Sequence, residues 1–185
     1  NLSNKNCQNL FLLACGNDNI DIMEFLLKNK ININIGDILD NKAIHYLACN
    51  NAINCGYLFF KYLEQFHKGK ILNYIFAKNK IGNTPFHICC LENSVDFLYI
   101  LIEFTKKHCK DIQFERNNDG LKPIQIALYN QNYECAKLLY NLLNLKDSEI
   151  TQCGDEYKHI IIKNFESKKE MTIESDIKTD FEKFF

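Results

Sequence analysis

The sequence lacks any apolar segment long enough to cross a membrane. Its most apolar stretch is uninterrupted only from Phe97 to Ile102, between Asp96 and Glu103, whereas a transmembrane helix needs about 20 apolar residues. The chain also lacks an excess of either charge, because it has 22 basic and 23 acidic residues and a net charge of −1. Binding to nucleic acid or to an anionic membrane surface has no electrostatic support in such a chain. We therefore expect no nucleic-acid partner and no membrane insertion.

The usual signatures of catalysis and metal binding are missing as well. No C-x₂-C pair, phosphate-cradling glycine loop, G-x-S-x-G or H-E-x-x-H motif occurs in the 185 residues. We predict no catalytic residue, no cofactor and no metal, so that this segment is not an enzyme. No cleavable signal precedes it, and the first residue is Asn1 rather than methionine, which favours a piece of a longer protein.

Cysteines are numerous, but they lack the pattern of a disulfide scaffold. Their number is odd, and most of them lie inside apolar helical patterns. A free cysteine packs like a small apolar side chain, so we expect reduced thiols and a cytoplasmic, intracellular location. The nine cysteines are at positions 7, 15, 49, 55, 89, 90, 109, 135 and 153.

The chain has only two prolines, and both lie in matching phrases. One phrase runs from Gly82 to Cys90 and the other from Gly120 to Leu128, while residues 42–49 and 9–15 fit the same frame. Self-similarity of this kind indicates a repeat protein. The apolar anchors of the four phrases, which are 33, 42 and 38 residues apart, are Phe11, Ile44, Phe86 and Ile124.

Each phrase has the chemistry of a turn followed by a helix start. Gly82 and Gly120 suit a tight turn with positive φ. Thr84 is a good N-cap residue, and Pro85 and Pro123 then occupy the first helical position, where the missing N–H costs nothing.

A second helix follows each of these first helices. It is predicted by apolar residues at a period of about 3.6. The four stripes are Ile22, Met23, Leu26 and Leu27; Phe59, Tyr62, Leu63 and Phe66; Phe97, Ile100, Leu101 and Phe104; and Cys135, Leu138, Leu139, Leu142 and Leu143.

These phrases resemble the signature of the ankyrin-repeat family, in which a glycine turn and Thr-Pro precede an apolar-His-apolar helix start. The resemblance implies an all-α, ankyrin-type helix–turn–helix solenoid with finger-like turns. An ankyrin repeat has 33 residues, so the second and third units carry insertions of nine and five residues, which we place in residues 68–78 and 106–115. The expected array is residues 1–146, in units 7–38, 40–78, 79–116 and 117–146.

The C-terminal residues 147–185 do not continue the repeat. Residues 157–165 have an apolar centre and predict a helix that caps the solenoid, since stacked repeats need an atypical unit at each end. The charged remainder, 166–185, is expected either to be loosely ordered or to dock through Phe181, Phe184 and Phe185.

His87, beside Cys89 and Cys90, allows two interpretations. The resemblance implies that histidines in this slot, His87 and His45, form hydrogen bonds within and between repeats. The alternative is a nucleophilic or metal site built from His87 and the two thiols.

The resemblance also implies a function, namely binding of another protein or peptide segment on the concave face of an otherwise monomeric array. Ile81 and Leu121 either contact that partner or merely brace adjacent turns. The full set of expected contact residues is Asn41, Asn50, Lys80, Ile81, Asn83, Leu91, Glu92, Asn118, Asp119, Leu121, Tyr129 and Asn130. Two other interpretations stay open: the substrate-recruiting domain of a larger enzyme such as an acyltransferase or kinase, and an ankyrin effector of an intracellular microbe that acts on host proteins.

Overall fold

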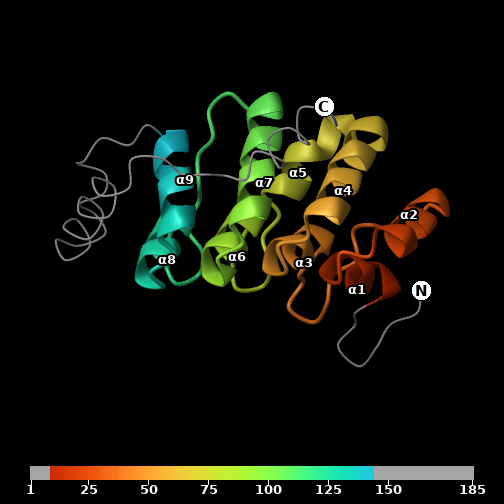
Figure 1. Cartoon of the computed structure of the whole chain (residues 1–185), viewed down its shortest axis with the longest axis horizontal. Coiled ribbons are helices and arrows are strands. Elements are labelled where there is room, and N and C mark those ends of the chain that lie inside the picture. The colour runs from red at the N-terminus through yellow and green to blue at the C-terminus, as the bar shows by residue number, and fades with distance from the viewer. Residues whose placement is uncertain (1–8, 144–185) are drawn as a thin grey trace.

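The computed structural model describes residues 9–143, which form a stack of four helix pairs (Figure 1). No strand occurs among these residues, so the predicted all-α solenoid is confirmed. The first helix of each unit starts where its phrase predicted. The described helices are α1 (Leu10–Gly16), α2 (Ile20–Lys28), α3 (Ala43–Cys49), α4 (Ile53–Phe66), the 3₁₀ turn η1 (Lys68–Lys70), α5 (Ile71–Ile75), α6 (Pro85–Glu92), α7 (Val95–His108), α8 (Pro123–Tyr129) and α9 (Tyr133–Leu143).

The two helices of a unit are joined by a short connection that contains one residue with positive φ. Aspartate and asparagine adopt this conformation more readily than most residues. Their side chains also reach the next unit: the Asp18 carboxylate accepts from the Cys55 backbone N–H at 2.7 Å, and the Asn51 amide oxygen accepts from that of Phe97 at 2.8 Å. In the four units the positive-φ residues are Asp18, Asn51, Asn93 and Gln131.

The two insertions lengthen the second helices of their units. Helices α4 and α7 have 14 residues each, whereas α2 has nine, so each gains about 7.5 Å of length. In the second unit, η1 and α5 lie in the connection that follows α4. Because α4 and α7 lengthen together, they stay paired to their ends: the Phe60 ring stacks on Phe104 at 4.2 Å, and Glu64 accepts from Lys107 at 2.8 Å.

One apolar core runs through all four units and is built largely from the predicted stripes. Of the stripe residues whose burial the structure describes, two are exposed, Ile22 and Phe66. Ile22 lies in α2 at the position that corresponds to Cys55 in α4 and to Phe97 in α7. The backbone N–H groups of Cys55 and Phe97 bond to the preceding unit, but no unit precedes α2 among the described residues. Phe66 is 61% exposed because it lies beyond the end of the shorter α2.

None of the described helices has the length and apolarity that a membrane span requires. The predicted capping helix at 157–165 and the three phenylalanines of the C-terminal end lie outside the described residues. The boundary between array and C-terminal segment therefore stays a prediction.

Substitution of the two positive-φ glycines should separate backbone strain from steric contact. Gly82 and Gly120 have φ of 75° and 77°, but only at Gly82 would a Cβ atom meet a neighbour, 2.8 Å from the Asn118 backbone nitrogen. We expect Gly120→Ala to lower the free energy of unfolding by about 1 kcal/mol and Gly82→Ala by about 1–2 kcal/mol more, through overpacking. Urea denaturation measures both. Equal losses would contradict the close approach of the two turns.

Candidate functional site

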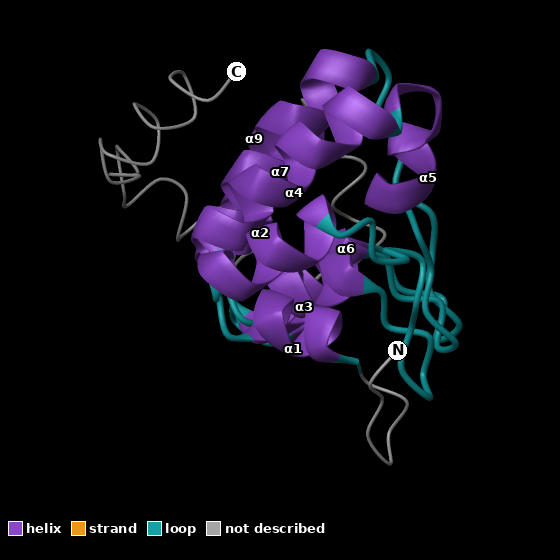
Figure 2. Ribbon diagram, turned by 90° about the vertical axis from the view of Figure 1, so that its right-hand side faces the viewer, coloured by secondary structure: helices purple, strands orange, loops and turns teal. Residues whose placement is uncertain are grey.

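Three finger-like turns project from one side of the stack, where Figure 2 shows the loops gathered. We call residues 37–41, 79–83 and 117–121 the fingers. In each, a side-chain oxygen of the first residue accepts from the backbone N–H groups two and four residues later; in the second finger the Asn79 oxygen accepts from Ile81 and Asn83 at 3.1 and 2.9 Å. The first finger lacks the glycine of the other two, but it has the same bonds, with Asp40 at positive φ in place of glycine.

Neighbouring fingers are joined edge to edge. The Asn79 amide donates to Asn41 Oδ1 at 2.8 Å, and the Asn117 amide donates to Asn83 Oδ1 at 2.9 Å. We call these two amide hydrogen bonds the asparagine ladder. Backbone hydrogen bonds run beside the ladder; in one of them the N–H of Lys80 donates to a carbonyl of the first finger at 2.8 Å. The fingers thus form one continuous ribbon, in which each finger fixes the position of the next.

Buried histidines tie this ribbon to the first helices. The Nδ1 atom of His87 accepts from the Thr84 backbone N–H at 3.1 Å, so the proton is on Nε2, which donates to the Leu121 carbonyl of the next finger at 3.0 Å. His45 repeats the arrangement with the carbonyl of Asn83 at 3.1 Å. The predicted hydrogen bonds within and between units are therefore confirmed.

Both histidines are held in the neutral form. Burial lowers the pKa of His87 from 6.5 to about 4, and burial likewise lowers the pKa of His45. Protonation would place a hydrogen on the Nδ1 atom that accepts the capping N–H. In the fourth unit the same slot is held by Gln125, whose Oε1 accepts from the Lys122 N–H at 2.8 Å.

The arrangement of His87 with its neighbouring thiols favours a structural role. Cys89 and Cys90 are fully buried, and burial raises the pKa of each thiol well above 9.0. A thiol without access to its thiolate form is a poor nucleophile and a poor metal ligand. Both ring nitrogens of His87 already have partners, and the described residues contain no group of three His, Cys, Asp or Glu side chains placed to hold a metal.

A groove of about 310 Å³ lies between the second and third units. We call it the concave-face groove; one wall is made by the first and second fingers and the other by α3 and α6. Three apolar side chains on its rim, Leu39, Ile81 and Leu91, are each 43–46% exposed. Its lining residues are Asp37, Leu39, Asn41, His45, Tyr46, Cys49, Asn50, Asn79, Ile81, Asn83, Ile88, Leu91 and Glu92.

Half of the predicted contact residues line this groove: Asn41, Asn50, Ile81, Asn83, Leu91 and Glu92. Two of these do not present their side chains to solvent as expected. Asn83 is buried and Asn41 half-buried, because both amides belong to the asparagine ladder. Leu39, which the sequence reasoning missed, precedes Ile81 by 42 residues, the spacing of the second and third units, and that spacing would have identified it.

The other predicted contact residues lie outside the groove. Lys80, Asn118 and Asp119 are exposed on the finger tips, and Asn130 is exposed at the end of α8. Tyr129, 72% exposed, extends the apolar surface toward the fourth unit. Leu121 is half-buried against the core, which favours the bracing role for its side chain.

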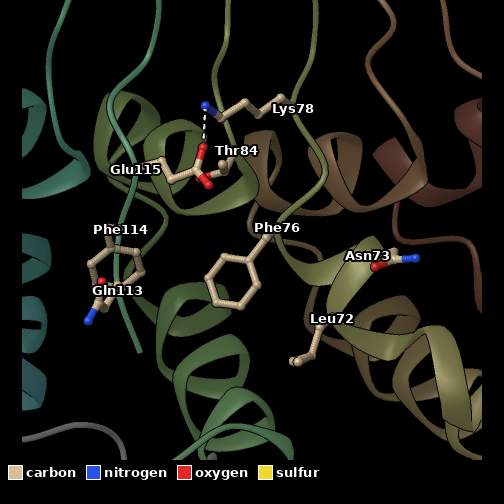
Figure 3. Close-up of a pocket in the computed structure, with 8 residues that line it drawn as sticks. All are labelled: Leu72, Asn73, Phe76, Lys78, Thr84, Gln113, Phe114 and Glu115. Atoms are coloured by element: carbon tan, nitrogen blue, oxygen red, sulfur yellow. Dashed lines mark ion pairs between the residues drawn. The ribbon is translucent and has the colours of Figure 1, made fainter. Parts of the chain in front are cut away.

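A second hollow, of about 360 Å³, lies between the connections that follow α4 and α7 (Figure 3). Phe76, which follows α5, and Phe114, in the loop after α7, flank it. Lys78 bonds to Glu115 across the rim at 2.6 Å, and this bond lowers the pKa of the exposed glutamate. Phe86 packs between the two phenylalanines, at 5.6 and 4.7 Å. These contacts brace the two connections against each other, so we treat this hollow as structural.

The neutral histidines predict an acid-sensitive fold. Since the pKa of His87 is lower in the folded chain, its contribution to stability is complete above pH 6.5 and is lost as the pH falls toward 4. We expect His87→Gln, which copies Gln125 of the fourth unit, to retain the cap. Between pH 7 and 4.5 the wild type should then lose about 2 kcal/mol more of its unfolding free energy than the variant. Urea denaturation at both pH values tests this, and parallel pH profiles would contradict it.

Alkylation of the native protein should distinguish buried from exposed thiols. Iodoacetamide at pH 7.4 is expected to modify the exposed Cys49 well before Cys89 and Cys90, which should react only after unfolding. Peptide mass spectrometry follows each position. Native modification of Cys89 as fast as that of Cys49 would revive the nucleophile interpretation.

Comparison with known proteins agrees with this architecture. A family model of three ankyrin-repeat copies matches residues 60–151, and a single ankyrin-repeat model matches residues 8–35. The fold is similar to the crystal structure of the human ASB11 ankyrin repeat domain, with a TM-score of 0.56 and 18% identity over 72% of this chain and 54% of that one. The chain thus spans about half the length of that domain. No curated protein matches it in sequence. The two family models reach into all four units, and the chain belongs to the ankyrin-repeat family.

Proposed function

We propose that this chain binds a partner protein through the concave-face groove. Ankyrin repeats are generally protein–protein interaction modules and are typically non-catalytic. The observation that carries the proposal is the grouping of Leu39, Ile81 and Leu91 around one groove of about 310 Å³. Apolar side chains gathered in this way on a surface are typical of interaction sites.

The groove is suited to an apolar anchor from the partner. The asparagine ladder and the histidine bonds hold the backbone of its walls in place before a partner binds, so little conformational entropy is lost on binding. Asn50 and Glu92 supply exposed polar groups on the same surface, which suits a rim around an apolar centre. Tyr129 offers a further aromatic contact in the fourth unit.

Affinity capture with matched variants tests the proposal. We expect Ile81→Asp combined with Leu91→Asp to abolish recovery of a specific partner protein, because both charges would be buried at the contact. Phe25→Asp is the control, since Phe25 is 65% exposed on α2 and does not line the groove. Calorimetry with the captured protein should show at least a tenfold loss of affinity for the groove variant, about 1.4 kcal/mol or more.

Retention of the partner by the double variant would remove the groove from the binding surface. Equal loss in the Phe25→Asp control would show that the effect is not specific to the groove. Tyr129→Ala, measured separately, reports whether the contact extends to the fourth unit, whereas a substitution of Leu121 would also disturb a half-buried brace.

A further inference from the structure

The unequal lengths of α2 and α4 create a step on the side of the stack formed by the second helices (Figure 1). Helix α2 ends at Lys28 after nine residues, while α4 continues to Phe66 over 14. On its other side α4 packs against α7, through the stacked Phe60 and Phe104 rings and the ion pair of Glu64 with Lys107. Toward α2, the last turn of α4 has no equivalent helix to cover it.

A groove of about 630 Å³ occupies this step, and we call it the step groove. Leu58, Tyr62 and Phe66, spaced by four residues, form an apolar stripe along α4, and Tyr62 packs on Phe66 at 4.8 Å. The step groove shares no lining residue with the concave-face groove, so a ligand in it is independent of the proposed function. It is lined by Glu24, Leu27, Lys28, Lys30, Leu58, Lys61, Tyr62, Gln65, Phe66 and His67.

The charge of the step groove is positive. Of its three lysines, Lys28 is paired with Glu24 at 2.9 Å. No carboxylate among the described residues forms an ion pair with Lys30 or Lys61. A segment that fills the groove therefore needs an apolar face bordered by carboxylates.

The sequence after α9 contains such a segment at residues 174–185. Its apolar residues, Ile177, Phe181, Phe184 and Phe185, follow the i, i+4, i+7, i+8 spacing that places side chains on one face of an α-helix. This segment contains four acidic residues and two lysines. In a helix, Asp176 and Asp180 would border the apolar face on one side, and on the other side Lys178 would lie between that face and Glu182.

The connecting chain is long enough for this segment to reach the step groove. Helix α9 and helix α2 are at opposite ends of the array in Figure 1. Four units stacked at about 10 Å separate them by about 30 Å, whereas residues 144–173 span up to about 100 Å when extended.

We propose that residues 174–185 of this chain dock in the step groove, with the phenylalanines against the α4 stripe and the carboxylates beside Lys30 and Lys61. Lys30 and Lys61, which form no ion pair within residues 9–143, the aromatic pair on α4 and the helical spacing of the segment all favour this occupant. Docking would extend the stack by a helix where α2 ends, and would hold the C-terminal segment against the first two units.

A tryptophan reporter in the full chain tests this docking. The chain has no tryptophan, so Phe184→Trp introduces a single fluorophore. We expect its emission to be blue-shifted and its quenching by acrylamide to be clearly weaker than in the same chain unfolded in guanidinium. Adding Phe66→Gln or Lys61→Glu should shift the emission to the red and raise quenching toward the unfolded value. Phe181→Trp repeats the measurement one turn away.

Phe25→Gln provides the matched control, because Phe25 and Phe66 are similarly exposed, at 65% and 61%, but only Phe66 lines the step groove. This variant should leave the reporter protected. Circular dichroism verifies that each variant is folded. The proposal is overturned if the reporter is as accessible as in the unfolded chain, or if its protection survives both groove variants. Protection that grows with protein concentration would also overturn it, by assigning the occupant to a second copy.

Discussion

The joining of the middle units depends on the hydrogen bond by which a buried imidazole in one unit holds the finger of the next. His87 receives the Thr84 N–H and donates to the Leu121 carbonyl, and His45 does the same one unit earlier. The imidazole can accept the capping N–H and donate to the carbonyl at the same time only in its neutral form, which burial favours. It fixes the angle between first helices and fingers, and so determines the shape of the concave-face groove.

The insertions show a second constraint, that neighbouring helices must cover each other. α4 and α7 are longer than α2 by the same amount and remain paired through Phe60 and Phe104. Where the lengths differ, between α2 and α4, an apolar stripe stays open and lysines border it. The two surfaces we propose for binding thus have separate origins: the concave-face groove comes from the repeat itself, and the step groove from a departure from it.

The candidate site was only partly predictable from the sequence. Carrying the family pattern onto single positions gave Ile81 and Leu91, which do line the groove, but it also gave Asn83, whose amide is buried in the ladder. Leu39 was missed because the finger it belongs to lacks glycine and looked irregular, although Asp40 adopts the same positive φ. Burial of a polar side chain depends on its partner in another unit, and local sequence does not contain that partner.

The sequence by itself determined the element types, the starts of the first helices and the repeating frame. Turn residues, N-caps and helical periodicity act over a few neighbouring positions, so they can be recognised without knowing the rest of the chain. Only the tertiary structure decided that the insertions lengthen helices, that Ile22 and Phe66 stay exposed, and that a groove forms at the step. These features result from the relative lengths and stacking of whole units, because a side chain is covered only where a neighbouring helix extends far enough to reach it.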